Sequence, residues 1–81
     1  MARYLHDEHG STIGYMDSND KYLYSTAGVG IAYWDSNHKY MFTPAGKTFG
    51  YLDPRGRYLY TQSGKTVGYF HPPYEHKDWG L

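Results

Sequence analysis

The sequence contains no cysteine, so neither a disulfide nor a thiolate metal site stabilises it. At 81 residues the chain has a modest core, and packing, a partner subunit or both must stabilise it. An excess of one charge is missing as well, because eight basic residues balance eight acidic ones and are dispersed along the chain. This pattern excludes the basic stripe typical of proteins that bind long nucleic acids, and the polybasic patch of membrane-surface proteins.

Long apolar runs are also missing. No run approaches the roughly 20 apolar residues that a membrane-spanning helix requires. The N-terminal residues 1–7 lack the apolar core of a secretion signal. We therefore expect a cytoplasmic protein with no membrane partner.

Aromatic residues are abundant, with eleven tyrosines, three phenylalanines and two tryptophans. Aromatic side chains favour pleated sheets. Tyrosine also suits binding surfaces, since it offers a large rigid ring with a polar tip. The composition indicates a sheet that carries a contact surface.

The chain repeats itself with a period of 18 residues. The copies run over residues 3–17, 21–35, 39–53 and 57–71, and three-residue joints separate them. Residues 1–71 are therefore predicted to form one repeat domain, and residues 72–81 a tail outside the repeat. Pro72 and Pro73 are expected to end the last strand, because proline cannot donate to a strand ladder.

Each copy holds two short strands around a glycine turn. Thr43-Pro44-Ala45-Gly46-Lys47 is typical of a type I turn followed by a left-handed residue, a three-residue hairpin loop with a bulge. The joints repeat this pattern, with Gly56, Asp20 and His38 in the left-handed position. Asp17, Asp35 and Asp53 are expected to cap the joint turns. The fold class is thus all-β, an up-and-down antiparallel meander of four hairpins.

The loop length predicts the register. Leu23 is expected opposite Ile31, Tyr22 opposite Ala32, and Asp17 opposite Lys21. The predicted core face then carries these residues: Leu5, Leu23, Met41, Leu59, Ile13, Ile31, Phe49, Val67, Tyr15, Tyr33, Tyr51 and Tyr69. The opposite face carries a second aromatic set: Tyr4, Tyr22, Tyr40, Tyr58, His6, Tyr24, Phe42, Tyr60, Met16, Trp34, Leu52 and Phe70. Gly14, Ala32, Gly50 and Gly68 lie among these rings and are expected to let a neighbouring ring cover the backbone.

Two apolar faces are one too many for a free single-layer sheet. A partner subunit, a ligand or the curling of the sheet itself must cover the second face. An open meander would also leave two strand edges free. We therefore favour a barrel or flower with four-fold pseudosymmetry, closed by pairing of the first and fourth copies with Arg3 opposite His71.

The fourfold unit [KR]-Y-[LM]-x-x-x-x-G-x-x-x-[GA]-Y-x-[DH], which covers residues 3–71, resembles the small proteins described as having a four-fold β-flower fold. That resemblance implies a shape and no activity. A more distant likeness is to the aromatic hairpin repeats of choline- and glucan-binding cell-wall proteins. The chain lacks their paired tryptophans and a secretion signal.

Catalytic and metal-binding patterns are weak. The spacing of His6 and His9 suits a metal, but His6 replaces a tyrosine of the repeat and His9 falls in a turn, so we predict no metal and no cofactor. The recurring aspartates lie in separate copies beside a lysine or arginine and form no carboxylate pair for acid–base work. We expect no enzymatic activity.

The second aromatic face is the best candidate for a functional surface. We predict a non-enzymatic, self-associating protein that binds a small planar, nucleotide-like or sugar-like ligand. The predicted binding residues are Tyr22, Tyr24, Trp34, Tyr40, Phe42, Tyr58, Tyr60, Phe70, Arg3 and His6. Basic residues near the hairpin ends (Arg3, Lys21, Lys39, Arg57) are expected to meet phosphates if the ligand is a nucleotide. The alternative is an assembly or protein-binding module without a small ligand. For the tail from Tyr74 onward, the alternatives are folding back over an aromatic face, docking on a neighbouring subunit and a frayed terminus.

Overall fold

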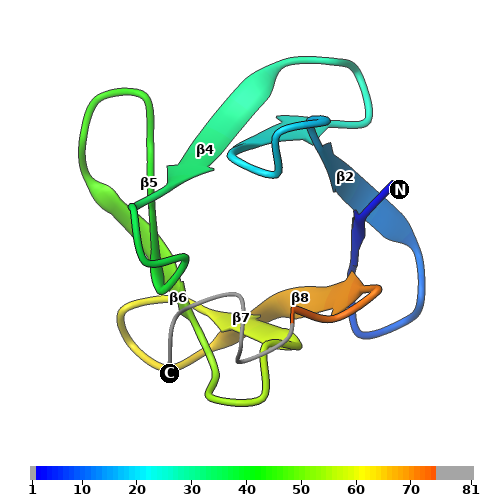
Figure 1. Cartoon of the computed structure of the whole chain (residues 1–81). Helices are drawn as coiled ribbons and strands as arrows, with labels where there is room; N and C mark the ends of the chain where they lie inside the picture. The colour runs from blue at the N-terminus through cyan, green and yellow to red at the C-terminus, as the bar shows by residue number, and fades with distance from the viewer. Residues whose placement is uncertain (1, 75–81) are drawn as a thin grey trace.

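The computed structural model describes residues 2–74 of the chain, which form eight strands and no helix. The strands are β1 (Tyr4–His6), β2 (Thr12–Met16), β3 (Tyr22–Ser25), β4 (Gly30–Trp34), β5 (Tyr40–Phe42), β6 (Thr48–Leu52), β7 (Tyr58–Tyr60) and β8 (Thr66–His71). Each strand pairs antiparallel with the next, and β8 pairs with β1 to close a barrel (Figure 1). The predicted all-β meander of hairpins and its closure are confirmed.

The hairpin turns follow the predicted pattern. Gly10, Gly28, Gly46 and Gly64 have φ values of 86°, 85°, 87° and 88°, the left-handed conformation that glycine adopts without steric cost. In the third copy the amide of Gly46 donates to the carbonyl of Thr43, and the amide of Thr43 donates to the carbonyl of Lys47. The turns project outward between successive strands and give the barrel four petals (Figure 1).

The joints use the same backbone pattern, and an aspartate caps each of them. Asp20, His38 and Gly56 have φ values of 59°, 56° and 76°. The Asp17 carboxylate accepts hydrogen bonds from the amides of Lys21 (2.7 Å) and Tyr22 (3.1 Å). Asp35 and Asp53 accept the corresponding bonds in their joints, which confirms the predicted capping role.

The predicted register is wrong by one residue. The loop places Tyr24 opposite Gly30 as its length requires, but a bulge then shifts the pairing. Leu23 lies opposite Ala32 rather than Ile31, and Tyr22 lies opposite Tyr33 rather than Ala32. The same shift occurs at the same place in the other three hairpins. A bulge inserts one unpaired residue, so every side chain beyond it changes face.

The face assignment is wrong for the same reason. The barrel interior holds the leucine row together with the row predicted on the opposite face: Leu5, Leu23, Met41 and Leu59, with Met16, Trp34, Leu52 and Phe70. The bulged residues Ile13, Ile31, Phe49 and Val67 are half-buried and pack against this core. The tyrosines predicted for the core face lie half-buried rather than in the core: Tyr15, Tyr33, Tyr51 and Tyr69. Curling of the sheet therefore covers the row that contains Trp34 and Phe70.

Three glycines allow adjacent strands to approach inside the barrel. A Cβ at Gly14, Gly50 or Gly68 would lie closer than 3.0 Å to a backbone carbonyl oxygen of the neighbouring strand. The side chains nearest these glycines are leucines, Leu23, Leu59 and Leu5, and not the aromatic rings expected from the sequence. The glycines thus allow the sheet to curve tightly.

At the seam, β1 and β8 pair in the same register as two strands joined by a three-residue joint, although no joint connects them. Leu5 lies opposite Phe70, as Leu23 lies opposite Met16 and Leu59 opposite Leu52. His71 pairs with Tyr4 and not with Arg3, so that prediction is off by one residue. The expected pairing of Asp17 with Lys21 is wrong in the same way, since the Asp17 amide donates to the carbonyl of Tyr22.

The chain beyond β8 returns to the end of the barrel that carries the joints. β8 ends at His71, directly before Pro72 and Pro73 as predicted. Tyr74 then packs against the core and is 3 % exposed. It occupies the repeat position of Asp20, His38 and Gly56, each 18 residues from the next. Residues 75–81 of the predicted tail lie outside the described residues.

We expect Gly50→Ala to destabilise the barrel by about 2 kcal/mol or more, because the new Cβ would meet the carbonyl of Tyr60. Gly30→Ala is the matched control. Its Cβ would lie 3.6 Å from the nearest atom, a ring carbon of Tyr24, so we expect no loss of stability. Urea unfolding of both variants measures the difference. Equal destabilisation by the two substitutions would contradict the close approach of β6 and β7.

Candidate ligand-binding surface

Aromatic pairs form a belt around the outside of the barrel. The rings of Tyr15 and Tyr24 stack across a joint at a centroid distance of 5.6 Å and an interplanar angle of 28°. The pairs Tyr33–Phe42, Tyr51–Tyr60 and Tyr69–His6 occupy the corresponding places at 5.9, 5.5 and 5.3 Å. Such cross-strand pairs stabilise a sheet by about 0.2–1 kcal/mol each, so part of this belt is structural.

A second row of rings stands beside the belt and is open to solvent. Tyr4, Tyr22, Tyr40 and Tyr58 are 38–44 % exposed. Lys21 and Lys39 each place their ammonium 5.6 Å from the ring of the tyrosine that follows them, within the range of a cation–π contact. Arg57 lies over both Tyr58 (5.9 Å) and Tyr69 (5.3 Å). The row therefore offers flat apolar area with positive charge at its edge.

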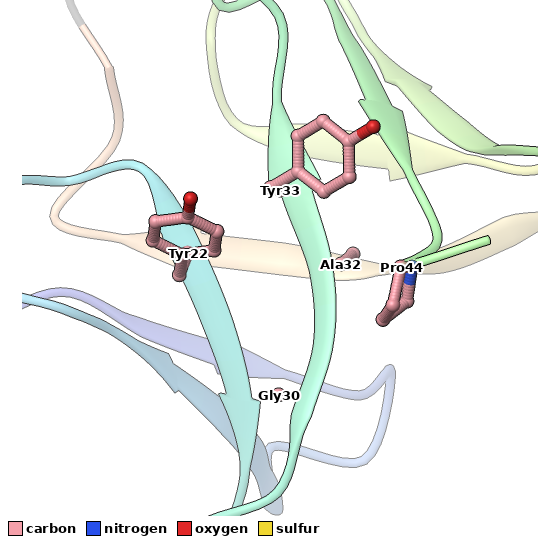
Figure 2. Close-up of a pocket in the computed structure, with 5 residues that line it drawn as sticks. All are labelled: Tyr22, Gly30, Ala32, Tyr33 and Pro44. Carbon is pink, nitrogen blue, oxygen red and sulfur yellow. The ribbon is translucent and has the colours of Figure 1, made fainter. Parts of the chain in front are cut away.

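In the second copy the two rows border a depression of about 310 Å³, lined by Tyr22, Gly30, Ala32, Tyr33 and Pro44. Figure 2 shows Tyr22 on β3, Tyr33 on β4 and Pro44 approaching from the following hairpin. The two tyrosine rings are 6.2 Å apart and inclined at 51°. The lining is apolar apart from the phenol groups and the backbone, a composition that suits a flat ligand with a few polar edges.

Two of the residues that line this depression depart from the repeat. Gly30 replaces a threonine that the other copies carry at positions 12, 48 and 66. Pro44 stands where the other copies have Glu8, Thr26 and Gln62. A glycine in a strand often marks a place where a ligand or another backbone approaches closely. Comparison of the four copies predicts both departures, but neither Gly30, Pro44 nor Tyr33 was among the predicted binding residues.

The predicted binding residues separate into three groups. Tyr22, Tyr40 and Tyr58 lie exposed outside the barrel, and His6, Tyr24, Phe42 and Tyr60 lie half-buried in the outer belt. Trp34 and Phe70 lie inside the barrel, 2 % and 0 % exposed. Arg3 lies at the end of the barrel near Tyr74. The seven outer residues are thus distributed over the four hairpins on the outside of the barrel, and of all the predicted binding residues only Tyr22 lines the depression.

The joint end of the barrel holds a polar cluster around the Tyr74 ring. The Tyr74 hydroxyl accepts a hydrogen bond from Trp34 Nε1 (2.9 Å) and donates one to Asp20 Oδ1 (3.1 Å). The Arg3 guanidinium lies over the ring at 3.8 Å from its centroid and forms an ion pair with Asp20. His38 contacts both Trp34 and Tyr74 at centroid distances of 5.7 Å and hydrogen-bonds the carbonyl of Asp20.

Burial raises the pKa of the Tyr74 hydroxyl well above its ordinary value, and the negative charge of Asp20 raises it further. The Tyr74 hydroxyl therefore stays protonated at a pH where an exposed tyrosine ionises. A protonated phenol is required for the bond that it donates to Asp20.

Among residues 2–74, no group of three or more histidine, aspartate or glutamate side chains is placed to hold a metal ion. No helix in this part of the chain is long and apolar enough to cross a membrane.

Comparisons with protein-family models, curated proteins and solved structures give no match. The function is therefore inferred from the geometry alone.

The raised pKa of Tyr74 predicts that the free energy of unfolding falls at high pH. In the unfolded chain a tyrosine ionises near a pKa of about 10, whereas the folded state holds Tyr74 neutral to higher pH. Its contribution is complete below that pKa and declines as the pH rises above it, by at most about 1.4 kcal/mol per pH unit. We expect the stability advantage of the wild type over Tyr74→Phe to shrink between about pH 9 and 11 in urea unfolding. An advantage that stays constant over this range would show that the pKa of Tyr74 is unshifted.

Proposed function

We propose that this protein is a non-enzymatic binding protein whose outer tyrosine surface takes a small planar or sugar-like ligand. The observation that carries the proposal is the depression between Tyr22 and Tyr33, which Gly30 and Pro44 also line. Its volume of about 310 Å³ falls at the lower end of the range of small-molecule sites, about 300–1,000 Å³. It accommodates a single flat ring system.

The chemistry of the lining supports a flat ligand. Tyrosine rings stack on the faces of bases and sugars, and their hydroxyl groups serve as donors or acceptors at the edge. Lys21, whose ammonium stands over the Tyr22 ring, lies where it would meet a phosphate of a nucleotide-like ligand. A neutral sugar would use the phenol hydroxyl groups instead.

Amide spectra of the protein titrated with adenosine 5′-monophosphate, adenosine and maltotriose test the proposal. We expect at least one probe to shift the amide signals of Tyr22, Gly30 and Tyr33 in a saturable manner. Tyr22→Ala removes one stacking ring and should weaken binding of that probe about tenfold or more. The matched control is Tyr40→Ala, which removes the equivalent exposed ring of the next copy and should change affinity less than about twofold. Equal losses in the two variants would contradict a site in the second copy.

Gly30→Thr tests the same site by filling it. Threonine is the residue of the other three copies at this position, and the added Cβ would make only an ordinary contact with the Tyr24 ring. We expect the unfolding midpoint to be unchanged or raised and the binding of the responding probe to be lost. Retained binding in a folded Gly30→Thr protein would place the ligand elsewhere.

Self-association or binding of a protein partner is the second candidate. It is favoured by the exposed row of Tyr4, Tyr22, Tyr40 and Tyr58, which recurs in every copy. Tyrosine is enriched in protein interfaces, and a four-fold arrangement presents equivalent contacts around the barrel. Light scattering between about 10 and 500 μM should show a mass above that of one chain, and Tyr58→Ala should reduce it. A single-chain mass throughout would exclude self-association.

Two further predictions stay as proposals. Membership of the four-fold β-flower proteins is supported by the closed barrel of four hairpins. A cytoplasmic location is supported by the lack of cysteine and of long apolar runs.

A further inference from the structure

The joint end of the barrel departs from the repeat. The four equivalent positions there carry Asp20, His38, Gly56 and Tyr74. Three of these are left-handed turn residues, and the fourth lies over the core. The core residues at the same relative position in each copy also differ in size: Met16, Trp34, Leu52 and Phe70. The end of the barrel is therefore asymmetric in a fold that is otherwise nearly symmetric.

The residues at this end contact one face, the edges and the hydroxyl of the Tyr74 phenol. Arg3 lies over one face of the ring, at 3.8 Å from its centroid. Trp34 and Phe70 meet the ring in edge-on geometry, with centroids 5.5 and 5.2 Å away and planes at 85° and 79°. The hydroxyl has both a donor, Trp34 Nε1, and an acceptor, Asp20 Oδ1. Such complete pairing of a phenol hydroxyl discriminates strongly against a ring that lacks it.

The main chain of Tyr74 is held as well. Its amide donates to the carbonyl of Gly56 at 2.8 Å. A Cβ at Gly56 would overlap the Tyr74 carbonyl, so only glycine leaves room there. Arg3 donates to the carbonyl of Pro72 at 2.8 Å and more weakly to that of Pro73 at 3.4 Å. One arginine thus binds the ring, its carboxylate partner and the preceding backbone.

The groups that contact the phenol belong to the barrel and its joints rather than to the segment that carries Tyr74. Arg3 precedes β1, Asp20 and His38 lie in joints, and Trp34 ends β4. Their separations from Tyr74 along the chain range from four residues for Phe70 to 71 for Arg3. The eight strands close through pairing of β1 with β8 before the chain reaches Pro72. The recognising groups are therefore assembled by the closed barrel.

We propose that this end of the barrel is a binding site for a 4-alkylphenol, the side chain of tyrosine, that holds the chain's own Tyr74 in this structure and accepts a separate phenol when Tyr74 is removed or displaced. The site is distinct from the depression at Tyr22 and Tyr33, and it does not depend on the proposed function of that surface. Its ligand is a neutral phenol, because its hydroxyl must donate to Asp20. The source is either a free phenol or a tyrosine presented by another polypeptide.

Complementation of the full-length Tyr74→Ala protein tests the site. p-Cresol reproduces the removed side chain, and a ligand that binds only the folded state raises the unfolding temperature. At about ten times its dissociation constant, p-cresol should raise the unfolding midpoint of Tyr74→Ala by about 5–10 °C. The indole N–H signal of Trp34 should return toward its wild-type position. The wild-type protein, whose site is filled, should gain no more than about 1 °C at the same concentration.

Matched probes distinguish recognition of the phenol hydroxyl from the filling of an apolar cavity. Toluene has the shape of p-cresol without the hydroxyl and should bind at least about tenfold more weakly. N-Acetyltyrosinamide carries the backbone amides of a polypeptide tyrosine and would have to displace the backbone of residue 74 from the carbonyl of Gly56. Binding of it as tight as that of p-cresol identifies a polypeptide tyrosine as the ligand, and binding of p-cresol alone identifies a free phenol. Equal binding of toluene and p-cresol, no response of folded Tyr74→Ala, or an equal gain in the wild type would overturn the proposal.

If Tyr74→Ala does not fold with or without p-cresol, a double-mutant cycle between Tyr74→Phe and Asp20→Gly gives the answer. Glycine removes the oxygen that accepts from the hydroxyl, and it is the left-handed residue at the equivalent Gly56, while phenylalanine keeps the ring of Tyr74. We expect the drop in unfolding midpoint caused by Tyr74→Phe to be at least halved in the Asp20→Gly background. Fully additive effects would show that the carboxylate does not recognise the hydroxyl and would overturn the site.

Discussion

One unpaired residue in each hairpin determines how the rest of the barrel is built. Ile13, Ile31, Phe49 and Val67 are the bulged residues, and beyond each of them the alternation of side chains changes face. The change places Trp34 and Phe70 inside with the leucine row and sends the tyrosines beside them outward. A bulge also bends its strand and increases its twist, so the same feature that selects the core supplies the curvature for closure.

Closure accounts for a chain whose two sheet faces both look apolar. The inner face is covered by its own curvature, with Gly14, Gly50 and Gly68 leaving room for the adjacent backbone. The outer face keeps a belt of paired rings whose energetic role is structural, together with a row of four exposed tyrosines. The depression at Gly30 and Pro44 and the cluster around Tyr74 are two places where the copies differ.

Much of the fold could be predicted from the sequence, and much of the site could not. Repeating glycines and aspartates predicted the turns, their left-handed residues and the caps, since these depend on local backbone geometry. The register failed at Ile31 because a bulge in a strand interior carries no residue signature as strong as a glycine turn. That single error in register placed Trp34 and Phe70 on the outer face and Tyr33 in the core. Two of the predicted binding residues therefore lie in the core of the structure. Gly30 and Pro44 were readable by comparing the copies.

Four hairpins, their turns and the need to cover a second apolar face follow from the amino-acid sequence, because periodicity and turn chemistry are local properties of the chain. The tertiary structure fixes which rings lie inside, since that depends on the bulge and on the curvature of the closed sheet. It alone also assembled Arg3, Asp20, Trp34 and His38 around Tyr74. These residues come from different copies and joints, and the shared repeat position of Asp20, His38 and Tyr74 does not by itself predict that they meet. Pairing of β1 with β8 brings the first and last copies together and makes that assembly complete.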